Sequence, residues 1–317
     1  MKALDELVKY ATAGDPIRGL KWTRKTSRKL SRALKRRGYP VGADTVRRLL
    51  HQQGYVLRAN RKRLNKKRDP DRDRQMRYLV RQRRMRQKVG SPVISVDAKQ
   101  RELVGNFKNP GRTWRQTRLD VWGSDYPNQA EGVAIPYGVY DVTQNVGFVI
   151  VGTSHQTPKF TVTAIRRWWL KVGQKHYADQ KQMLVEADCG GGNGNRCWLW
   201  KLGLQQLADE FDLTITVTHL PTSASKWNPI EHKLFCHIER NWAGQPLVSY
   251  ETVLKYIRTT RTETGLRCWA YLDRTEYETG YKITAEQKAL INLKPHRVIP
   301  RWNYTIAPRK NSRKTEK

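Results

Sequence analysis

The chain has 317 residues and carries 61 Lys+Arg against 28 Asp+Glu, a formal charge of +33 that calls for a polyanionic partner. Its 38% hydrophobic content and 11 Trp support a buried core, which excludes a wholly disordered basic tail. No run of about 18 apolar residues occurs, and the first residues lack a secretory signal pattern. We therefore expect a cytoplasmic, nucleoid-associated protein without a membrane partner.

The basic residues gather near the N-terminus. Between Arg18 and Lys88 there are 27 Lys+Arg and only four acidic residues. A buried-strand pattern begins after Gly90-Ser91-Pro92, so the basic segment precedes a more ordinary globular body. The expected organisation is a helix-turn-helix module at 1–60, a basic linker and helix at 61–90, a catalytic core at 91–260, and a C-terminal extension with a basic tail at 261–317.

Two short amphipathic helices are expected within the first module. Thr26 or Ser27 can cap the first, Gly38 to Gly42 turn the chain, Asp44 caps the second, and Gly54 ends it. This pattern is typical of a helix-turn-helix, whose second helix enters the major groove of DNA. The alternative is a helical hairpin with a solvated basic face. Residues expected to contact DNA are Thr45, Arg47, Arg48 and Gln52 from the second helix, and Arg61, Lys62, Arg63, Lys66 and Lys67 from the linker.

The body begins with strands. The apolar run from Pro92 to Asp97 predicts a central strand that ends in a carboxylate. The runs 134–140 and 147–151 flank a polar turn and predict a hairpin. A helix that opens at Thr157-Pro158 then leads to a strand over 183–188, which also ends in a carboxylate, Asp188.

Further elements complete an α/β pattern. A helix carries Trp200, Leu204, Leu207 and Phe211 at helical spacing, and the alternating strand 213–219 follows, whose alternation predicts a sheet edge. A last helix opens at Asn228-Pro229. The fold class expected is α/β, a mixed five-stranded sheet with flanking helices, preceded by a small all-α module.

Three carboxylates are candidates for a metal site. Right-handed crossovers place the strands of Asp97 and Asp188 side by side and parallel, and Glu231 follows at the start of the last helix. Hard oxygen ligands suit Mg²⁺ or Mn²⁺, and a pair of such ions can drive phosphodiester chemistry. Without a cation the carboxylates repel, so we expect at least one to have a raised pKa.

Other roles remain open for these residues. Asp97 can be a buried aspartate satisfied by backbone amides, and Asp188, which precedes a glycine run, can be a turn former. Glu231 stands three residues after Asn228, the spacing of a capping box. The histidines, His219 among them, show no metal-ligand spacing and are interpreted as ordinary polar or core residues.

Several motifs together resemble one family. The stretches SVDAKQRELVGNFKNPGRTW, EADCGGGNGNRCWLWKL and HLPTSASKWNPIEHKLF are similar to the ISAzo13 family of bacterial insertion-sequence transposases, over roughly residues 14–308. The resemblance implies a DDE transposase with a ribonuclease H-like core. It also implies that Asp97, Asp188 and Glu231 form the catalytic, metal-binding triad, with Mg²⁺ or Mn²⁺, in two ions, as cofactor.

The resemblance sets the expected function. A DDE transposase cleaves DNA strands at transposon ends and joins them to target double-stranded DNA, and it acts as a homo-oligomer on DNA. Alternatives are a structure-selective nuclease that releases ends without joining them, and a shortened, non-catalytic DNA-binding derivative. Relatives carry a further N-terminal helix-turn-helix, so we also expect codons for one upstream of Met1.

Overall fold

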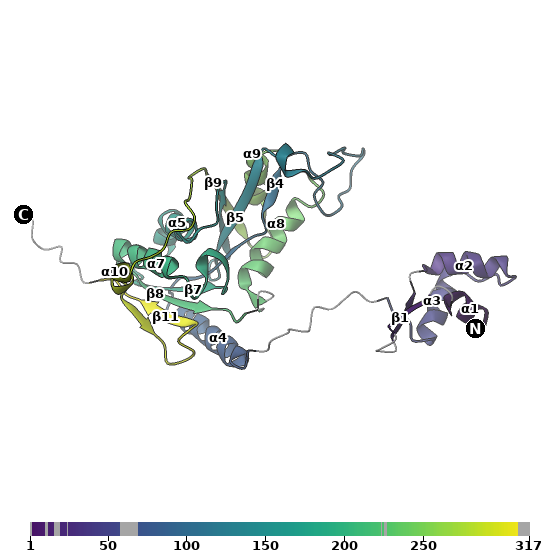
Figure 1. The fold of residues 1–317 in the computed structure, drawn as a ribbon, viewed down its shortest axis with the longest axis horizontal. Helices are drawn as coiled ribbons and strands as arrows, with labels where there is room; N and C mark the ends of the chain where they lie inside the picture. The colour runs from purple at the N-terminus through teal and green to yellow at the C-terminus, as the bar shows by residue number, and fades with distance from the viewer. Residues whose placement is uncertain are drawn as a thin grey trace, which may run out of the picture. The chain divides into compact units, whose positions relative to one another are not determined.

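The computed structural model describes residues 2–9, 12–15, 20–23, 25–57, 69–222, 224 and 227–309. The chain divides into two compact units, Met1–Leu64 and Asn65–Lys317. Each unit is described by itself below, and both are drawn in Figure 1. No helix of the described residues is long and apolar enough to cross a membrane.

Unit 1 has three helices and a small hairpin. The helices are α1 (Lys2–Lys9), α2 (Ser27–Arg36) and α3 (Ala43–Gln52), and the antiparallel strands are β1 (Thr12–Asp15) and β2 (Leu20–Thr23). Leu4, Leu30 and Val46, one from each helix, are buried together. The expectation of an all-α module is therefore wrong, because the segment before α2 pairs as a hairpin.

The turn between α2 and α3 follows its sequence signals. The Thr26 hydroxyl accepts a hydrogen bond from the Lys29 amide at 3.2 Å and so caps α2. Gly38 has φ of +83°, and Gly54, with φ of +79°, lies just after α3. Asp44, expected as a cap, lies one residue inside α3 and accepts instead from Arg47 at 2.7 Å, because Gly42 occupies the cap position.

Unit 2 is a large mixed sheet covered on both faces by helices (Figure 1). Its helices, including 3₁₀ and π-helical turns, are α4 (Arg72–Lys88), η1 (Pro127–Gln129), α5 (Pro158–Trp168), η2 (Trp169–Gly173), α6 (Gln174–His176), η3 (Gly191–Asn193), α7 (Trp198–Phe211), η5 (Glu231–Phe235), α8 (Cys236–Asn241), α9 (Tyr250–Thr259) and α10 (Ala285–Ala289). Its strands are β3 (Val93–Ala98), β4 (Glu102–Val104), β5 (Gly132–Asp141), β6 (Val146–Gly152), β7 (Gln182–Ala187), β8 (Thr214–His219), β9 (Arg267–Asp273), β10 (Leu293–Pro295) and β11 (Asn303–Ile306).

The sheet has nine strands, in the order β10-β11-β8-β7-β3-β5-β6-β9, with β4 paired to β5. The five predicted strands form its centre, and β3, β7 and β8 run parallel. The expectation of five strands is wrong, because β9, β10 and β11 from the C-terminal segment extend both sides. β8 is likewise no edge, since β11 pairs with it.

The two faces of the sheet carry separate cores. Ile94 and Val96 of β3 pack in one core with Trp168 of α5 and Trp200 of α7. The opposite face of β5 and β6 packs against the buried side chains of η5, α8 and α9. Buried β3 residues therefore alternate between a wholly apolar face and a face that carries polar side chains.

Helix α4 packs under β7 on that second face. Its Arg83 guanidinium donates to both oxygens of Glu186 at 2.8 and 2.6 Å, and Glu186 is fully buried. Gln75 of α4 exchanges hydrogen bonds with Asn303 of β11 at 2.8 and 2.7 Å. The helix expected in the basic linker therefore belongs to unit 2. Through Glu186, it contacts β7 two residues before Asp188.

Candidate active site

Asp97 and Asp188 lie at the carboxyl ends of neighbouring parallel strands. The last registered pair of β3 and β7 is Val96 with Ala187, and the two aspartates follow directly. Both side chains line one hollow of about 290 Å³, together with Lys99, Gln156 and Asn193. The predicted adjacency of these two carboxylates is therefore confirmed.

Glu231 reaches the same region because its helix packs closely over β5. Gly138 is the residue of β5 that pairs with Asp97. A Cβ atom on Gly138 would lie 2.8 Å from Ile230 Cδ1 and 2.8 Å from Phe235 Cε1, so only glycine admits the helix at this distance. Glu231 does not line the hollow of the aspartates. Its electrostatic interaction with both of them nevertheless shows that it is near.

Asn228 ties the Glu231 helix to the strand of Asp97. Its side-chain amide donates to Asp97 Oδ2 at 2.8 Å, and its Oδ1 accepts from the Ser95 hydroxyl at 2.5 Å. The Ser95 hydroxyl in turn accepts from the Ile230 amide at 3.4 Å. The Glu231 amide donates to the Asn228 carbonyl oxygen at 3.2 Å, while Asn228 Oδ1 is engaged with Ser95. The capping-box alternative for Glu231 therefore finds no support.

A chain of buried hydrogen bonds fixes the backbone at Asp188. His219 Nδ1 lies 2.7 Å from the Asp188 carbonyl oxygen, and His219 Nε2 lies 3.2 Å from the Tyr304 hydroxyl, which accepts from Trp200 Nε1 at 3.1 Å. Burial lowers the pKa of His219 to about 4, so the ring is neutral. With the proton of the His219 ring on Nδ1, each donor in this series of hydrogen bonds has an acceptor.

The side chain of Asp188 is held from the glycine run that follows it. Asn193, buried in the 3₁₀ turn η3, donates to Asp188 Oδ1 at 2.9 Å. Gly191 has φ of +60°, and a Cβ on Gly192 would meet the Thr157 backbone at 3.0 Å. The glycine run after Asp188 therefore forms a close-packed support for its side chain.

All three carboxyl groups have raised pKa values. Burial and then the charge of Asp188 raise the pKa of Asp97 to about 8, while the Ala98 amide and Asn228 oppose the rise. Burial raises the pKa of Asp188 and of Glu231, and for Glu231 the charge of Glu239 adds to the rise. The expectation of a raised pKa is confirmed, although burial contributes more than repulsion between carboxylates.

The donor set fits a hydrated divalent cation shared by the aspartates. Mg²⁺ binds through one or two carboxylates and completes its shell with water and phosphate. The Tyr137 hydroxyl is buried without a hydrogen-bond partner among the described residues, and the charges of Asp97 and Asp188 help to raise its pKa. Tyr137 itself does not line the hollow, so the candidate ligands there are the two aspartates. No group of three or more His, Cys, Asp or Glu in the described residues is arranged to hold a metal ion, so Glu231 stands outside the aspartate pair.

A family model describes nearly the whole chain. The model of the Rhodopirellula transposase DDE domain matches residues 3–308. The chain belongs to this ISAzo13-type family of DDE transposases. The resemblance seen in its motifs is therefore confirmed. Among curated proteins, none matches the sequence.

Several solved structures of Mos1 transposase show distant similarity to the chain. The Mos1 transposase paired-end complex with left transposon end has 16% identity and a TM-score of 0.45, over 80% of this chain and 68% of that chain. The mariner Mos1 paired-end complex with Mn has 16% identity and a TM-score of 0.44, over 73% and 65%. The catalytic domain of Mos1 mariner transposase has 13% identity and a TM-score of 0.42, over 61% and 80%.

The expected DNA-contact residues of this DDE transposase family member divide into two groups. Arg47, Arg48 and Gln52 are exposed on α3, and Thr45 is half-buried. Arg47 forms an exposed ion pair with Asp44. The second group, Arg61, Lys62, Arg63, Lys66 and Lys67, lies outside the described residues.

Four residues at the site were missed or misread from sequence. Asn228 was expected only as a cap, His219 as an ordinary histidine, and Asn193 and Tyr137 had no assigned role. The alternation of β8 already places His219 on the same face as Val217, but a single sequence contains no signal for its bond to Asp188. Likewise, Tyr137 stands in a run whose other members are core residues.

Proposed function

We propose that the protein is the DDE transposase of a bacterial insertion sequence, catalysing metal-dependent DNA strand cleavage and strand transfer from a ribonuclease H-like core. The single observation that carries the proposal is the pairing of Asp97 and Asp188 at the ends of adjacent parallel strands, in one hollow of a strongly basic chain. The substrate is double-stranded DNA, at the transposon ends and at the target, in the cytoplasm on the nucleoid. The acting species is a homo-oligomer on DNA.

Asp97 and Asp188 would hold Mg²⁺ or Mn²⁺, and Glu231 would complete the triad once DNA phosphate and a second ion are present. Bound there, the metal ions supply an activated attacking oxygen and stabilise the leaving oxygen of a phosphodiester. Movement of Glu231 toward the aspartates needs little rearrangement, because Asn228 already bonds Asp97 and begins the helix that carries Glu231.

The protein's own residues orient the carboxylates. Asn228 fixes Asp97 Oδ2 and leaves Oδ1 with the Ala98 amide. Asn193 fixes one oxygen of Asp188, and His219 fixes its backbone. Rotamers held by such bonds keep catalytic groups close to a productive geometry before substrate arrives. The negative charge of the carboxylates repels DNA phosphate, so a cation between them is electrostatically required.

A cleavage assay tests the proposal. Asp97→Asn, Asp188→Asn and Glu231→Gln should each abolish Mg²⁺- or Mn²⁺-dependent cleavage of DNA carrying the element's ends, with unchanged or stronger DNA binding. Asp141→Asn is the matched control, because Asp141 is a buried aspartate whose two backbone amide donors both bond Oδ1, an atom that asparagine keeps. It should cleave normally.

The products separate the alternative functions. Joined products between donor ends and target DNA support transposition, whereas free ends without joining indicate a structure-selective nuclease. DNA binding that is identical in the wild type and the three variants, with no cleavage by any, indicates a non-catalytic derivative. Full cleavage by one variant would remove that residue from the triad.

A further inference from the structure

A second groove lies between the helical segment after α5 and the edge strand β9. It has a volume of about 470 Å³. Three alternate residues of β9 face it, Arg267, Trp269 and Tyr271, while the residues between them face the opposite core. Tyr271 packs on Phe148 of β6 with ring centroids 5.3 Å apart, but Trp269, further along the edge, is 51% exposed. The apolar face of the sheet therefore ends, at the edge strand β9, in the exposed indole ring of Trp269.

The charges around the indole are all positive. Lys171 of η2, Lys175 of α6 and Arg267 of β9 line the groove, and none of its lining residues is acidic. Lys171, Lys175 and Arg267 are exposed and form no ion pair with any acidic side chain in the described ranges. Three free cations therefore surround one flat aromatic surface.

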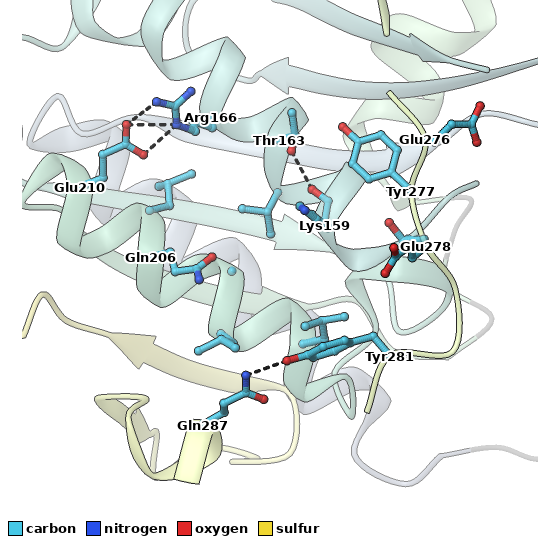
Figure 2. Close-up of a pocket in the computed structure, with 16 residues that line it drawn as sticks. Lys159, Thr163, Arg166, Gln206, Glu210, Glu276, Tyr277, Glu278, Tyr281 and Gln287 are labelled. Atoms are coloured by element: carbon cyan, nitrogen blue, oxygen red, sulfur yellow. Dashed lines mark hydrogen bonds and ion pairs between the residues drawn. The ribbon is translucent and has the colours of Figure 1, made fainter. Parts of the chain in front are cut away.

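Another hollow of unit 2 shows the contrast. The hollow of about 630 Å³ between α5 and α7 presents Glu210, Glu276 and Glu278 alongside Lys159 (Figure 2). Its Arg166 is held by Glu210 at 2.5 Å. That hollow would repel a polyanion, whereas the groove beside β9 attracts one.

We propose that the groove beside β9 binds an unpaired stretch of DNA, with one base stacked on Trp269 and neighbouring phosphates on Lys171, Lys175 and Arg267. A groove of this volume admits a nucleotide or two but no duplex. Aromatic rings between cations bind single strands without sequence preference, because every base has a π-face. The inference goes beyond the proposed function, since it requires no cleavage.

The groove is separate from the carboxylates. Arg267 is aligned through Val146 and Asp141 with Ile94, at the start of β3, whereas Asp97 is near its end. Three strand spacings and three residues along a strand give a separation of roughly 17 Å. A DNA strand bound in the groove would therefore lie away from the reacting phosphodiester, in the position of flanking or displaced DNA.

Binding of a fluorescent oligothymidylate of about 15 nucleotides to the full chain tests the inference. Trp269→Ala should weaken binding about fivefold or more, and Trp269→Phe should restore much of the loss. The double variant Lys171→Gln/Lys175→Gln should reduce the slope of log K against log[salt] by about 1.4, for two lost phosphate contacts on a single strand. The control pair Lys255→Gln/Lys282→Gln has the same charge change on exposed lysines outside the groove.

The outcomes separate the groove from general basicity and from catalysis. Equal effects of the two lysine pairs, or none from Trp269→Ala in a protein of unchanged melting temperature, would overturn the inference. An equal loss for a duplex of the same length would overturn the single-strand assignment. Photocrosslinking of iododeoxyuridine to Trp269 in the cleavage-dead Asp188→Asn protein supports it, and does so even if the proposed chemistry fails.

Discussion

Replacing Asp97 with asparagine should make unit 2 more stable at neutral pH, although Asp97 is proposed to be catalytic. Its pKa rises to about 8 in the folded protein from an ordinary 3.8. Between these values the folded state holds one proton more than the unfolded state, so the free energy of unfolding falls as pH rises. For a single group the slope is about −1.4 kcal/mol per pH unit, or roughly 4 kcal/mol between about pH 4.5 and 7.5.

The substitution also has a cost that does not depend on pH. Asparagine Oδ1 can still accept from the Ala98 amide, but its Nδ2 would then face the Asn228 Nδ2, donor against donor. Such a lost bond costs on the order of 1 to 3 kcal/mol. The net gain at pH 7.5 is therefore smaller than the full titration effect, and at pH 4.5 the variant should be less stable than the wild type.

Urea unfolding followed by Trp fluorescence at the two pH values measures this effect. All Trp residues except Trp22 follow residue 65, so the signal reports chiefly on unit 2. The wild-type free energy of unfolding should fall more steeply with pH than that of the variant, and Mg²⁺ should flatten the wild-type dependence alone. Parallel pH dependences in the absence of metal would refute the reasoning about Asp97.

Three further perturbations have defined outcomes. Gly138→Ala should displace the Glu231 helix, cost about 1 to 3 kcal/mol in urea unfolding and impair cleavage, whereas Gly123→Ala, which meets no atom within 4 Å, should do neither. Tyr304→Phe should weaken Mn²⁺ binding, measured by calorimetry, because it removes the hydroxyl on His219, whereas Tyr177→Phe, which loses a buried hydroxyl bond elsewhere, should only lower the melting temperature. Arg83→Ala should lower stability by about 3 to 5 kcal/mol near neutral pH, because it leaves the buried Glu186 carboxylate without its partner. The loss should be smaller in acid, since burial already raises the pKa of Glu186 although Arg83 opposes the rise; an equal loss at both pH values would contradict this.

The central strands could be predicted because their signals are local. Continuous apolar runs that end in Asp97 and Asp188 indicate buried parallel strands, and crossover handedness makes them neighbours. The hairpin of β5 and β6 follows from its polar turn. The edge strands could not be found in this way, since Asn303–Ile306 is short and its pairing with β8 depends on contacts far along the chain.

The pairing of the two aspartates was predictable, and the residues that support them were not. Asp97 and Asp188 were selected because they stand at strand ends, and the structure places them in one hollow, whereas Glu231, selected from its family motif, does not line that hollow. The Asn228 side chain can cap a helix end through its Oδ1 or donate to a carboxylate through its Nδ2. The close packing of the helix on Gly138 brings it to Asp97, and this packing cannot be read from the sequence. The helix α1 also escaped notice, although Leu4, Leu7 and Val8 have helical spacing.

The strands that come from the C-terminal segment have a consequence for synthesis on the ribosome. Gln75 of α4 bonds Asn303 across 228 positions of sequence, and both outer sides of the sheet are completed by residues beyond Arg267. A nascent chain that ends before β11 would expose the backbone edge of β8 and leave His219 without Tyr304. The unit therefore acquires its carboxylate geometry only when almost all of the chain has emerged, and an incomplete product presents an unpaired strand edge of the kind that favours aggregation.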